Sequence, residues 1–298
     1  MTEPPPDFDE ALYLKLNPDV SEAVHSGQFQ SGWQHYVCFG SAENRPGVQA
    51  PGPSGVDPFW DQLLGDVLPP PRLRKRVHGN ADIISFEQVG KIVAFDIATA
   101  VPTLGHGGKP QCVLDFGCGC GRVLRQLHKL TSTHHFYGCD IDPEAIDWCR
   151  AHLGHLAQFN TNPIHPPLPY EDNFFDTIFC ISIFTHLPEE MEHLWLSELR
   201  RVTKPGGHVL LTTHPKEMLE SSVSPETYAE FLRTGFFYQA GAGTDGLPDF
   251  YQDSFHTEGY IRDQWKEHFT VEAFIRRGIN FYQDLILCKK EPDPNTVR

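Results

Sequence analysis

Residues Val113-Leu-Asp-Phe-Gly-Cys-Gly-Cys-Gly-Arg122 decide the fold of this chain. The apolar run 112–116 has the length and composition of a buried strand, and glycines at 117, 119 and 121 then turn the chain into a helix over residues 122–130. Because glycine has no Cβ, the backbone of this turn can approach a ligand closely, and the helix N-terminus offers free N–H groups to a carboxylate or phosphate. The stretch predicts a ligand-binding turn between a strand and a helix.

Apolar strand-like runs alternate with helical runs from Gln111 onward, which is typical of a parallel sheet with helices on both faces. We expect strands over residues 112–116, 135–139, 175–184 and 207–213, and helices over residues 122–130, 143–153 and 188–202. Two further strands, 271–276 and 281–289, are joined by Arg277-Gly-Ile-Asn280, and this short connection predicts an antiparallel hairpin at the sheet edge. The chain is therefore expected to be an α/β protein.

The first seventy residues are organised differently. Residues 1–45 are expected to form a small helical module, in which Asn17-Pro18 ends a first helix and Gly40 stands where a C-cap is expected. Residues 46–70 are rich in proline and glycine and are interpreted as a linker. The main domain is expected over residues 71–298, with a helical segment at 83–101 near its start.

The charge balance disfavours a polyanion as the main partner. Lysine and arginine number 24 against 39 aspartates and glutamates, which gives a formal net charge of −15. Nucleic-acid-binding proteins normally carry a basic patch, and the only compact one in this sequence is Arg72-Leu-Arg-Lys-Arg76. We therefore predict that nucleic acid is not a partner.

No apolar run is long enough to span a membrane, and the first ten residues are acidic and proline-rich rather than signal-like. The sequence therefore predicts a cytoplasmic protein without a membrane partner. The eight cysteines agree, because most lie in apolar strand-like runs rather than at regular loop spacings. Cys118 and Cys120 are too closely spaced for the usual zinc site, so we expect buried thiols and no bound metal. The oligomeric state is not indicated.

An acidic residue follows the glycine-rich turn at a characteristic distance. Asp140 ends the next predicted strand, 19 residues after Gly121. A carboxylate in this position can accept hydrogen bonds from both ribose hydroxyls of an adenosine-containing cofactor. Both NAD and S-adenosylmethionine satisfy this requirement.

Three details separate these cofactors. The glycines follow the pattern G-x-G-x-G after Asp115, whereas dinucleotide-binding turns have G-x-G-x-x-G. Residues 173–187 are followed by Glu198-Leu-Arg-Arg-Val-Thr-Lys-Pro-Gly-Gly207, and the terminal hairpin supplies an antiparallel strand. Together, over residues 75–290, these features resemble the class I S-adenosylmethionine-dependent methyltransferases. The resemblance implies a Rossmann-like, seven-stranded, mostly parallel sheet with a C-terminal antiparallel hairpin, and S-adenosylmethionine as the cofactor.

The resemblance also implies a cofactor site. The methionine end would be held by Asp115, Gly117 and Gly119, together with backbone groups of Phe116 and Cys118. Asp140 would bind the ribose, and Ile141 would pack on the adenine. The acidic residue usual in the adenine loop is absent, so Asn162 is the candidate for the adenine amine. Beneath the transferred methyl group would lie Ser182 and Ile183, at the end of the fourth predicted strand.

Three segments outside this set have open interpretations. Residues 7–45 resemble a helical module found ahead of glycosyltransferases and methyltransferases of bacterial surface-polysaccharide clusters, or they are a packing appendage. The residues Arg74, Arg76 and Gly79 either close over the methionine carboxylate or form a solvated basic face. Tyr282-Gln-Asp284 resembles a pattern in polysaccharide-linked methyltransferases, or it serves only hairpin pairing.

A hydroxyl acceptor needs a base, whereas a thiol or amine acceptor can do without one. The candidates are His186 after the fourth predicted strand, His214 after the fifth, and His256 in the insertion, and for each the alternative is a structural role. The insertion, residues 215–269, is too long for a plain connection and is rich in aromatic residues. It either forms a lid over the acceptor or packs these aromatic residues into a core of its own.

The sequence thus predicts a methyltransferase acting on a small molecule or glycan, most readily on oxygen, with thiol and amine acceptors left open. Cys180-Ile-Ser-Ile-Phe184 stands where enzymes that methylate exocyclic amines of nucleobases have an Asn/Asp-Pro-Pro-aromatic motif. One alternative is a catalytically silent methyltransferase-fold scaffold whose first fifty residues dock a partner, and intact cofactor residues argue against it. Another is a nicotinamide oxidoreductase, which the glycine spacing disfavours.

Overall fold

The computed structural model describes residue 8 and residues 10–36, 67–104, 109–239 and 248–292. Contacts divide the chain into two compact units, residues 1–86 and residues 87–298. The sequence places the start of the main domain at residue 71, and that boundary stays a prediction. Most of the predicted linker over residues 46–70, and the predicted C-cap at Gly40, lie outside the described residues.

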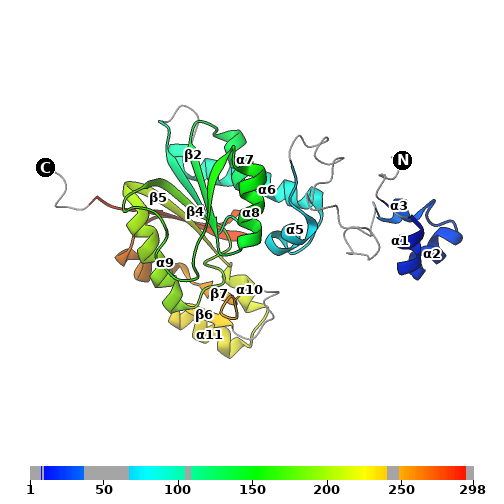
Figure 1. The fold of residues 1–298 in the computed structure, drawn as a ribbon. Coiled ribbons are helices and arrows are strands. Elements are labelled where there is room, and N and C mark those ends of the chain that lie inside the picture. Colours follow the sequence, from blue (N-terminus) through cyan, green and yellow to red (C-terminus); the bar gives the residue numbers. More distant parts are fainter. Residues whose placement is uncertain (1–7, 9, 37–66, 105–108, 240–247, 293–298) are drawn as a thin grey trace. The chain divides into compact units, whose positions relative to one another are not determined.

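The first unit contains short helices, α1 (Glu10–Leu16), α2 (Pro18–His25), α3 (Gly32–His35) and α5 (Pro71–His78), drawn in blue and cyan in Figure 1. The predicted break between the first two helices is confirmed, because α2 begins at Pro18. The Glu10 carboxylate accepts hydrogen bonds from the backbone N–H groups of Gly32 (2.6 Å) and Trp33 (3.0 Å). These bonds join α1 to the N-terminus of α3, which the Ser31 side chain also caps.

The second unit is built on a seven-stranded sheet with the order β3-β2-β1-β4-β5-β9-β8 (Figure 1). Its strands are β1 (Cys112–Phe116), β2 (His135–Asp140), β3 (Ala157–Thr161), β4 (Phe175–Cys180), β5 (Thr203–Thr213), β8 (Thr270–Ile279) and β9 (Gln283–Lys289). The pairs from β3 to β5 are parallel, and β9 is antiparallel to both β5 and β8. The predicted fold class is confirmed, including the C-terminal antiparallel hairpin.

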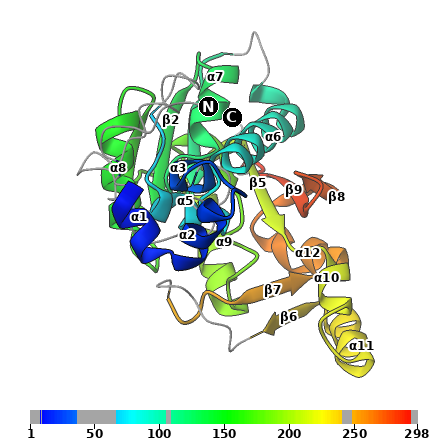
Figure 2. The same ribbon diagram turned by 90° about the vertical axis from the view of Figure 1, so that its right-hand side faces the viewer.

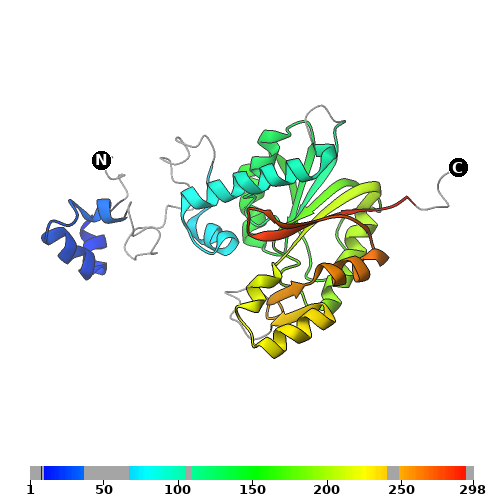
Figure 3. The same cartoon turned by 180° about the vertical axis from the view of Figure 1, so that it is seen from behind.

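The helices of this unit are α6 (Ile83–Ala100), α7 (Leu124–Leu130), α8 (Pro143–Leu153) and α9 (Glu189–Val202). Helix α8 begins where the sequence predicts, because the Asp142 side chain caps it by accepting from the N–H groups of Glu144 and Ala145. Figure 3 shows α6 across the rear of the sheet, where Asp96 accepts a hydrogen bond from the Asn280 N–H (2.8 Å). No helix in the described ranges is long and apolar enough to cross a membrane.

The insertion at residues 215–269 forms a cap beyond one end of the sheet (Figures 1 and 2). It contains α10 (Lys216–Glu220), α11 (Pro225–Thr234), α12 (Glu258–Gln264) and a separate two-stranded antiparallel sheet of β6 (Phe236–Gln239) and β7 (Asp253–His256). Leu219, Phe231 and Phe255 form a small core of the cap, whereas Trp265 is fully buried in the main core. Part of the aromatic content therefore serves packing, as one of the two interpretations predicts.

Two strand predictions need correction. β3 was not predicted, because polar Gln158 and Asn160 interrupt its short apolar sequence. These residues form a strand by pairing with β2. The hairpin turn lies at residues 280–282 rather than 277–280, since Ile279 still pairs with Gln283. Arg277 (φ 49°) produces an irregularity within β8 instead of the turn itself.

The described cysteines are free thiols, and all of them except Cys112 are buried. This agrees with the prediction of reduced, packed thiols. Cys38 lies outside the described residues.

Candidate functional site

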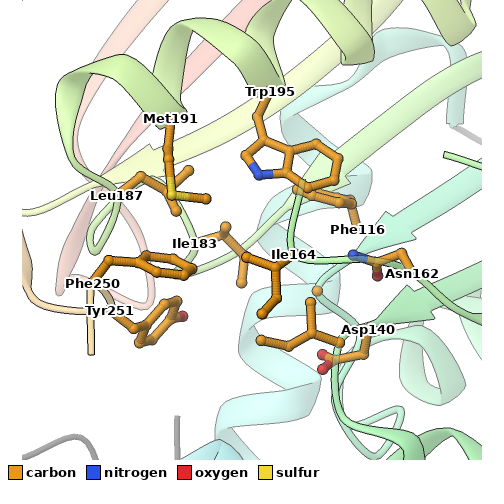
Figure 4. A pocket seen from close by; sticks show the side chains of 12 residues that line it. Phe116, Asp140, Asn162, Ile164, Ile183, Leu187, Met191, Trp195, Phe250 and Tyr251 are labelled. Carbon is orange, nitrogen blue, oxygen red and sulfur yellow. The ribbon is translucent and has the colours of Figure 1, made fainter. Parts of the chain in front are cut away.

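A pocket opens at the carboxyl ends of β1, β2 and β4, where parallel α/β sheets bind ligands (Figure 4). It is lined by Phe116, Gly117, Asp140, Ile141, Asn162, Ile164, Ile183, Leu187, Met191, Trp195, Phe250 and Tyr251. Figure 4 shows Asp140 and Asn162 on one side and Phe250 and Tyr251 on the other. The pocket is thus polar on one side and apolar on the other.

The glycine-rich turn after β1 forms part of the polar side. Gly117, Gly119 and Gly121 all have positive φ, and a Cβ at Gly117 would meet Ile183 Cδ1 at 2.5 Å. The N–H groups of Gly117 and Cys118 both donate to the Cys139 carbonyl, at 2.8 and 3.0 Å. Any larger residue at position 117 would therefore displace Ile183 and disturb the pocket floor.

Asp140 is held with both carboxylate oxygens in place. Oδ2 accepts from the Gly119 N–H (2.7 Å), and Oδ1 accepts from the Asp142 N–H (2.9 Å). Burial raises the pKa of Asp140, while these backbone hydrogen bonds counteract the rise. Each oxygen can accept a further hydrogen bond, so the carboxylate can bind two neighbouring hydroxyl groups.

Asn162 presents a buried acceptor to the same side of the pocket. Its Nδ2 donates to the Pro163 carbonyl (2.9 Å), whereas its buried Oδ1 has no hydrogen-bond partner among the described residues. An unpaired buried oxygen costs about 1–3 kcal/mol, which a ligand N–H would recover. The adenine amine predicted for this residue is such a donor.

Asp115 and Cys118 are buried beneath the turn and do not line the pocket. Asp115 Oδ2 finds no hydrogen-bonding group in the described part of the chain. Burial, and next the charge of Asp140, raise the pKa of Asp115 well above its ordinary value. The structure thus buries Asp115 instead of placing it at the pocket surface.

Ser182 has a strained backbone at the end of β4, with φ of 62°. Its N–H donates to Thr212 Oγ1 (2.9 Å), its Oγ accepts from Gln283 Nε2 (2.9 Å), and its carbonyl accepts from the Tyr251 hydroxyl (2.7 Å). Gln283 therefore does more than pair the hairpin, which was one interpretation of the sequence. Ser182 itself does not line the pocket, whereas the adjacent Ile183 does.

His186 and His214 come together with Asp253, a residue that sequence reasoning missed. Asp253 Oδ1 lies 3.4 Å from His186 Nδ1 and 3.5 Å from His214 Nε2, and the two imidazole rings are 5.6 Å apart. Tyr251 stacks on His186 at 4.4 Å, so the cluster lies directly behind a wall of the pocket. Burial lowers the pKa of His186, and burial together with His186 lowers the pKa of His214 to about 4.

His256 is not at the pocket, contrary to the prediction that it lines the acceptor site. Its side chain is fully buried, and Nε2 contacts Glu192, which is equally buried. Glu192 also accepts from Trp265 Nε1 (2.8 Å) and from the Tyr260 hydroxyl (3.3 Å). The group therefore joins the cap to α9 as a structural network.

Arg74 is buried in the first unit and donates to the carbonyls of Ala81 (2.9 Å) and Pro69 (2.6 Å). It is therefore not part of a solvated basic face, which corrects one interpretation of this segment. Gly79 caps α5 in the left-handed conformation.

The pocket fits an adenosine cofactor with a flexible amino-acid end. Gly117 lines the pocket without a side chain, Asp140 has acceptors that suit a ribose diol, and Asn162 has an unpaired acceptor that suits an adenine amine. Strand order and site together define the class I fold of S-adenosylmethionine-dependent methyltransferases. Residues 113–207 match the family model described as "Methyltransferase domain", and the chain therefore carries a class I S-adenosylmethionine-dependent methyltransferase domain.

Similar proteins agree with this class. The chain is 27% identical to "Probable methyltransferase ltbC" of Aspergillus luteorubrus over 186 residues, which are 57% of this chain and 64% of that protein. It is 29% identical to tRNA N(3)-methylcytidine methyltransferase trm141 of Schizosaccharomyces pombe over 111 residues, 34% of this chain and 43% of the relative. The chain thus spans less than two thirds of the length of either relative.

A solved structure shows the same fold. It is the Burkholderia thailandensis 1,6-didemethyltoxoflavin-N1-methyltransferase with 1,6-didemethyltoxoflavin and S-adenosylhomocysteine bound. The two chains superpose with a TM-score of 0.50 at 15% identity, covering 76% of this chain and 92% of the other.

Proposed function

We propose that this protein transfers a methyl group from S-adenosylmethionine to a hydroxyl group of a small molecule or glycan. The observation that supports this most is the division of the pocket: acceptors for the cofactor on one side, and an apolar, aromatic wall on the other. The side opposite Asp140 and Asn162 consists of Leu187, Met191, Phe250 and Tyr251, and Ile164 and Trp195 complete the apolar lining nearer to the polar residues. Such a wall suits the body of an apolar molecule or the face of a sugar ring.

When bound, the cofactor supplies a methyl group already activated by a positively charged sulfur. The protein then has to align the acceptor oxygen and exclude water. Ile183 and Tyr251 are suited to this, because Tyr251 holds the backbone of Ser182 just before Ile183. We assign the removal of the hydroxyl proton to His186, His214 and Asp253, the cluster behind Tyr251.

Nucleic acid remains the alternative acceptor class, because the Schizosaccharomyces pombe relative is a tRNA methyltransferase by name. The net charge of −15 favours a small acceptor over a polyanion. A silent scaffold is disfavoured because Gly117, Asp140 and Asn162 retain the features that bind a cofactor.

The proposal is tested in two stages. First, S-adenosylmethionine and S-adenosylhomocysteine should each raise the melting temperature, since a ligand that binds only the folded state stabilises it, whereas NAD should not. Second, radiolabelled methyl transfer is measured to pooled small hydroxylated compounds, to oligosaccharides and to tRNA. Label on tRNA alone would contradict the acceptor assignment, and no stabilisation by either cofactor form would contradict the activity as a whole.

The Asn162→Leu variant should separate cofactor binding from folding. Leucine removes the unpaired buried oxygen, so the free energy of unfolding is expected to stay within about 1 kcal/mol of the original. Affinity for S-adenosylhomocysteine should fall roughly tenfold, because the adenine amine loses its acceptor. Calorimetric titration and urea unfolding measure the two effects, and Asn160→Leu is the control for affinity, because Asn160 lies two residues earlier in β3 and does not line the pocket. Unchanged binding by Asn162→Leu would place the adenine elsewhere.

A further inference from the structure

Three side chains from distant points of the chain meet beside the apolar half of the pocket. His186 follows β4, His214 follows β5, and Asp253 begins β7 of the cap. One ligand atom of each lies within 4.8 Å of the other two. Across the described part of the chain, no other three histidine, cysteine, aspartate or glutamate side chains bring ligand atoms this close.

We propose that His186, His214 and Asp253 bind one divalent transition-metal ion, such as Zn²⁺. Two imidazoles and one carboxylate are a common ligand set for such ions. A hard cation such as Mg²⁺ prefers oxygen ligands, and a soft cation such as Cu⁺ prefers sulfur ligands. Asp253 Oδ1 lies 3.4 Å from His186 Nδ1 and 3.5 Å from His214 Nε2, close to the spacing of about 3.3 Å that tetrahedral ligands with bonds of about 2.0–2.1 Å require. The ligand atoms of the two histidines lie within 4.8 Å of each other, so the imidazoles would approach each other when an ion binds.

The surroundings of the cluster suit a bound ion that enters from solvent. Only 23% of the His186 side chain and 7% of the His214 side chain are exposed. His186 Nδ1 now donates to the Gln252 carbonyl (3.2 Å), and the ion would take the place of that proton. Asp253 is 48% exposed, which leaves a path for the ion from solvent.

The ion would have two consequences. It would join the cap to the ends of β4 and β5, because Asp253 belongs to the cap and the histidines belong to the sheet. It would also keep a coordination position open, since the protein supplies three ligands. An acceptor hydroxyl that reaches this position past Tyr251 would lose its proton to water rather than to an imidazole of the cluster, because the ion lowers the pKa of the hydroxyl. Its oxygen would keep the electron pair that forms the bond to the methyl carbon while the carbon–sulfur bond breaks. This second role rests on the proposed function.

The experiment measures metal binding without using activity. The full chain is freed of metal with a chelator and titrated with Zn²⁺ and with Co²⁺, and the melting temperature is followed. We expect one ion per chain at the tight site, a rise in melting temperature, and a Co²⁺ spectrum typical of low coordination number. Because the Asp253 side chain is half-exposed, the Asp253→Asn variant should fold. This variant is expected to bind Zn²⁺ at least about tenfold more weakly.

Two controls identify the site. Asp249→Asn changes a neighbouring carboxylate in the same loop and should leave the affinity unchanged. His193→Ala disrupts a second pair of close histidines, His193 and His268, whose ring centroids are 5.5 Å apart. This variant should also bind Zn²⁺ at His186, His214 and Asp253 with unchanged affinity. No tight binding by the unmodified protein, or equal binding by Asp253→Asn, would overturn the metal site. If the ion binds but its removal leaves methyl transfer unchanged, the catalytic role is refuted while the site and the proposed function stand.

Discussion

The Asp140→Ala variant is expected to bind S-adenosylmethionine about 10- to 100-fold more weakly than the unmodified protein. The substitution removes both acceptors available to a ribose diol, and an unpaired buried hydroxyl costs about 1–3 kcal/mol. It also releases the Gly119 N–H (2.7 Å), so the glycine-rich turn loses one of its fixed points. Isothermal titration calorimetry with S-adenosylhomocysteine measures the loss directly.

Asp142→Ala is the matched control, because it lies two residues away and caps α8 instead of facing the pocket. Loss of this N-cap should lower the free energy of unfolding by about 1 kcal/mol, with little change in cofactor affinity. If Asp140→Ala binds the cofactor as tightly as the unmodified protein, the ribose-binding role of Asp140 is wrong.

The Glu192→Ala variant should lose about 3–5 kcal/mol of folding stability, the usual cost of removing one partner from a buried polar network. Glu192 is fully buried and contacts His256, Trp265 and Tyr260. Without it, Trp265 Nε1 and His256 Nε2 lose their partners in the core, whereas Tyr260 keeps its hydrogen bond to Glu189 (2.8 Å). Urea unfolding monitored by tryptophan fluorescence gives the free energy.

Glu190→Ala on the same helix is exposed and should change stability by less than about 0.5 kcal/mol. A Glu192→Ala variant as stable as Glu190→Ala would show that the network does not hold the cap to α9. Because none of the side chains of this network lines the pocket, the affinity of folded Glu192→Ala for S-adenosylhomocysteine should change far less than its stability.

The elements predicted most accurately carry local signals. The strand at residues 112–116 is bounded by glycines, and the helix at residues 143–153 begins with Asp142 and Pro143, so short stretches of sequence define both. β3 has no such signal: its residues become a strand by pairing with β2, with Phe136 opposite Ala157. The two strands of the cap are likewise defined by their pairing across the insertion.

The cofactor side of the pocket was predictable for a similar reason. Gly117, Asp140 and Ile141 lie on or next to turns that follow strands, and parallel strands bring those turns to one edge of the sheet. The acceptor side was not predictable in detail. Met191 and Trp195 come from α9 and Tyr251 comes from the cap, and only packing decides which of their side chains reach the pocket.

By itself, the amino-acid sequence determined the alternation of strands and helices apart from β3 and the two cap strands, the glycine-rich backbone after β1 and the carboxylate at the end of β2, since each depends on neighbouring residues. Only the tertiary structure decided that His186 and His214 meet Asp253, that His256 is buried against Glu192, and that Tyr251 holds Ser182. These contacts join positions far apart in the chain. Their formation depends on how the cap packs on the sheet, which no local pattern of residues encodes.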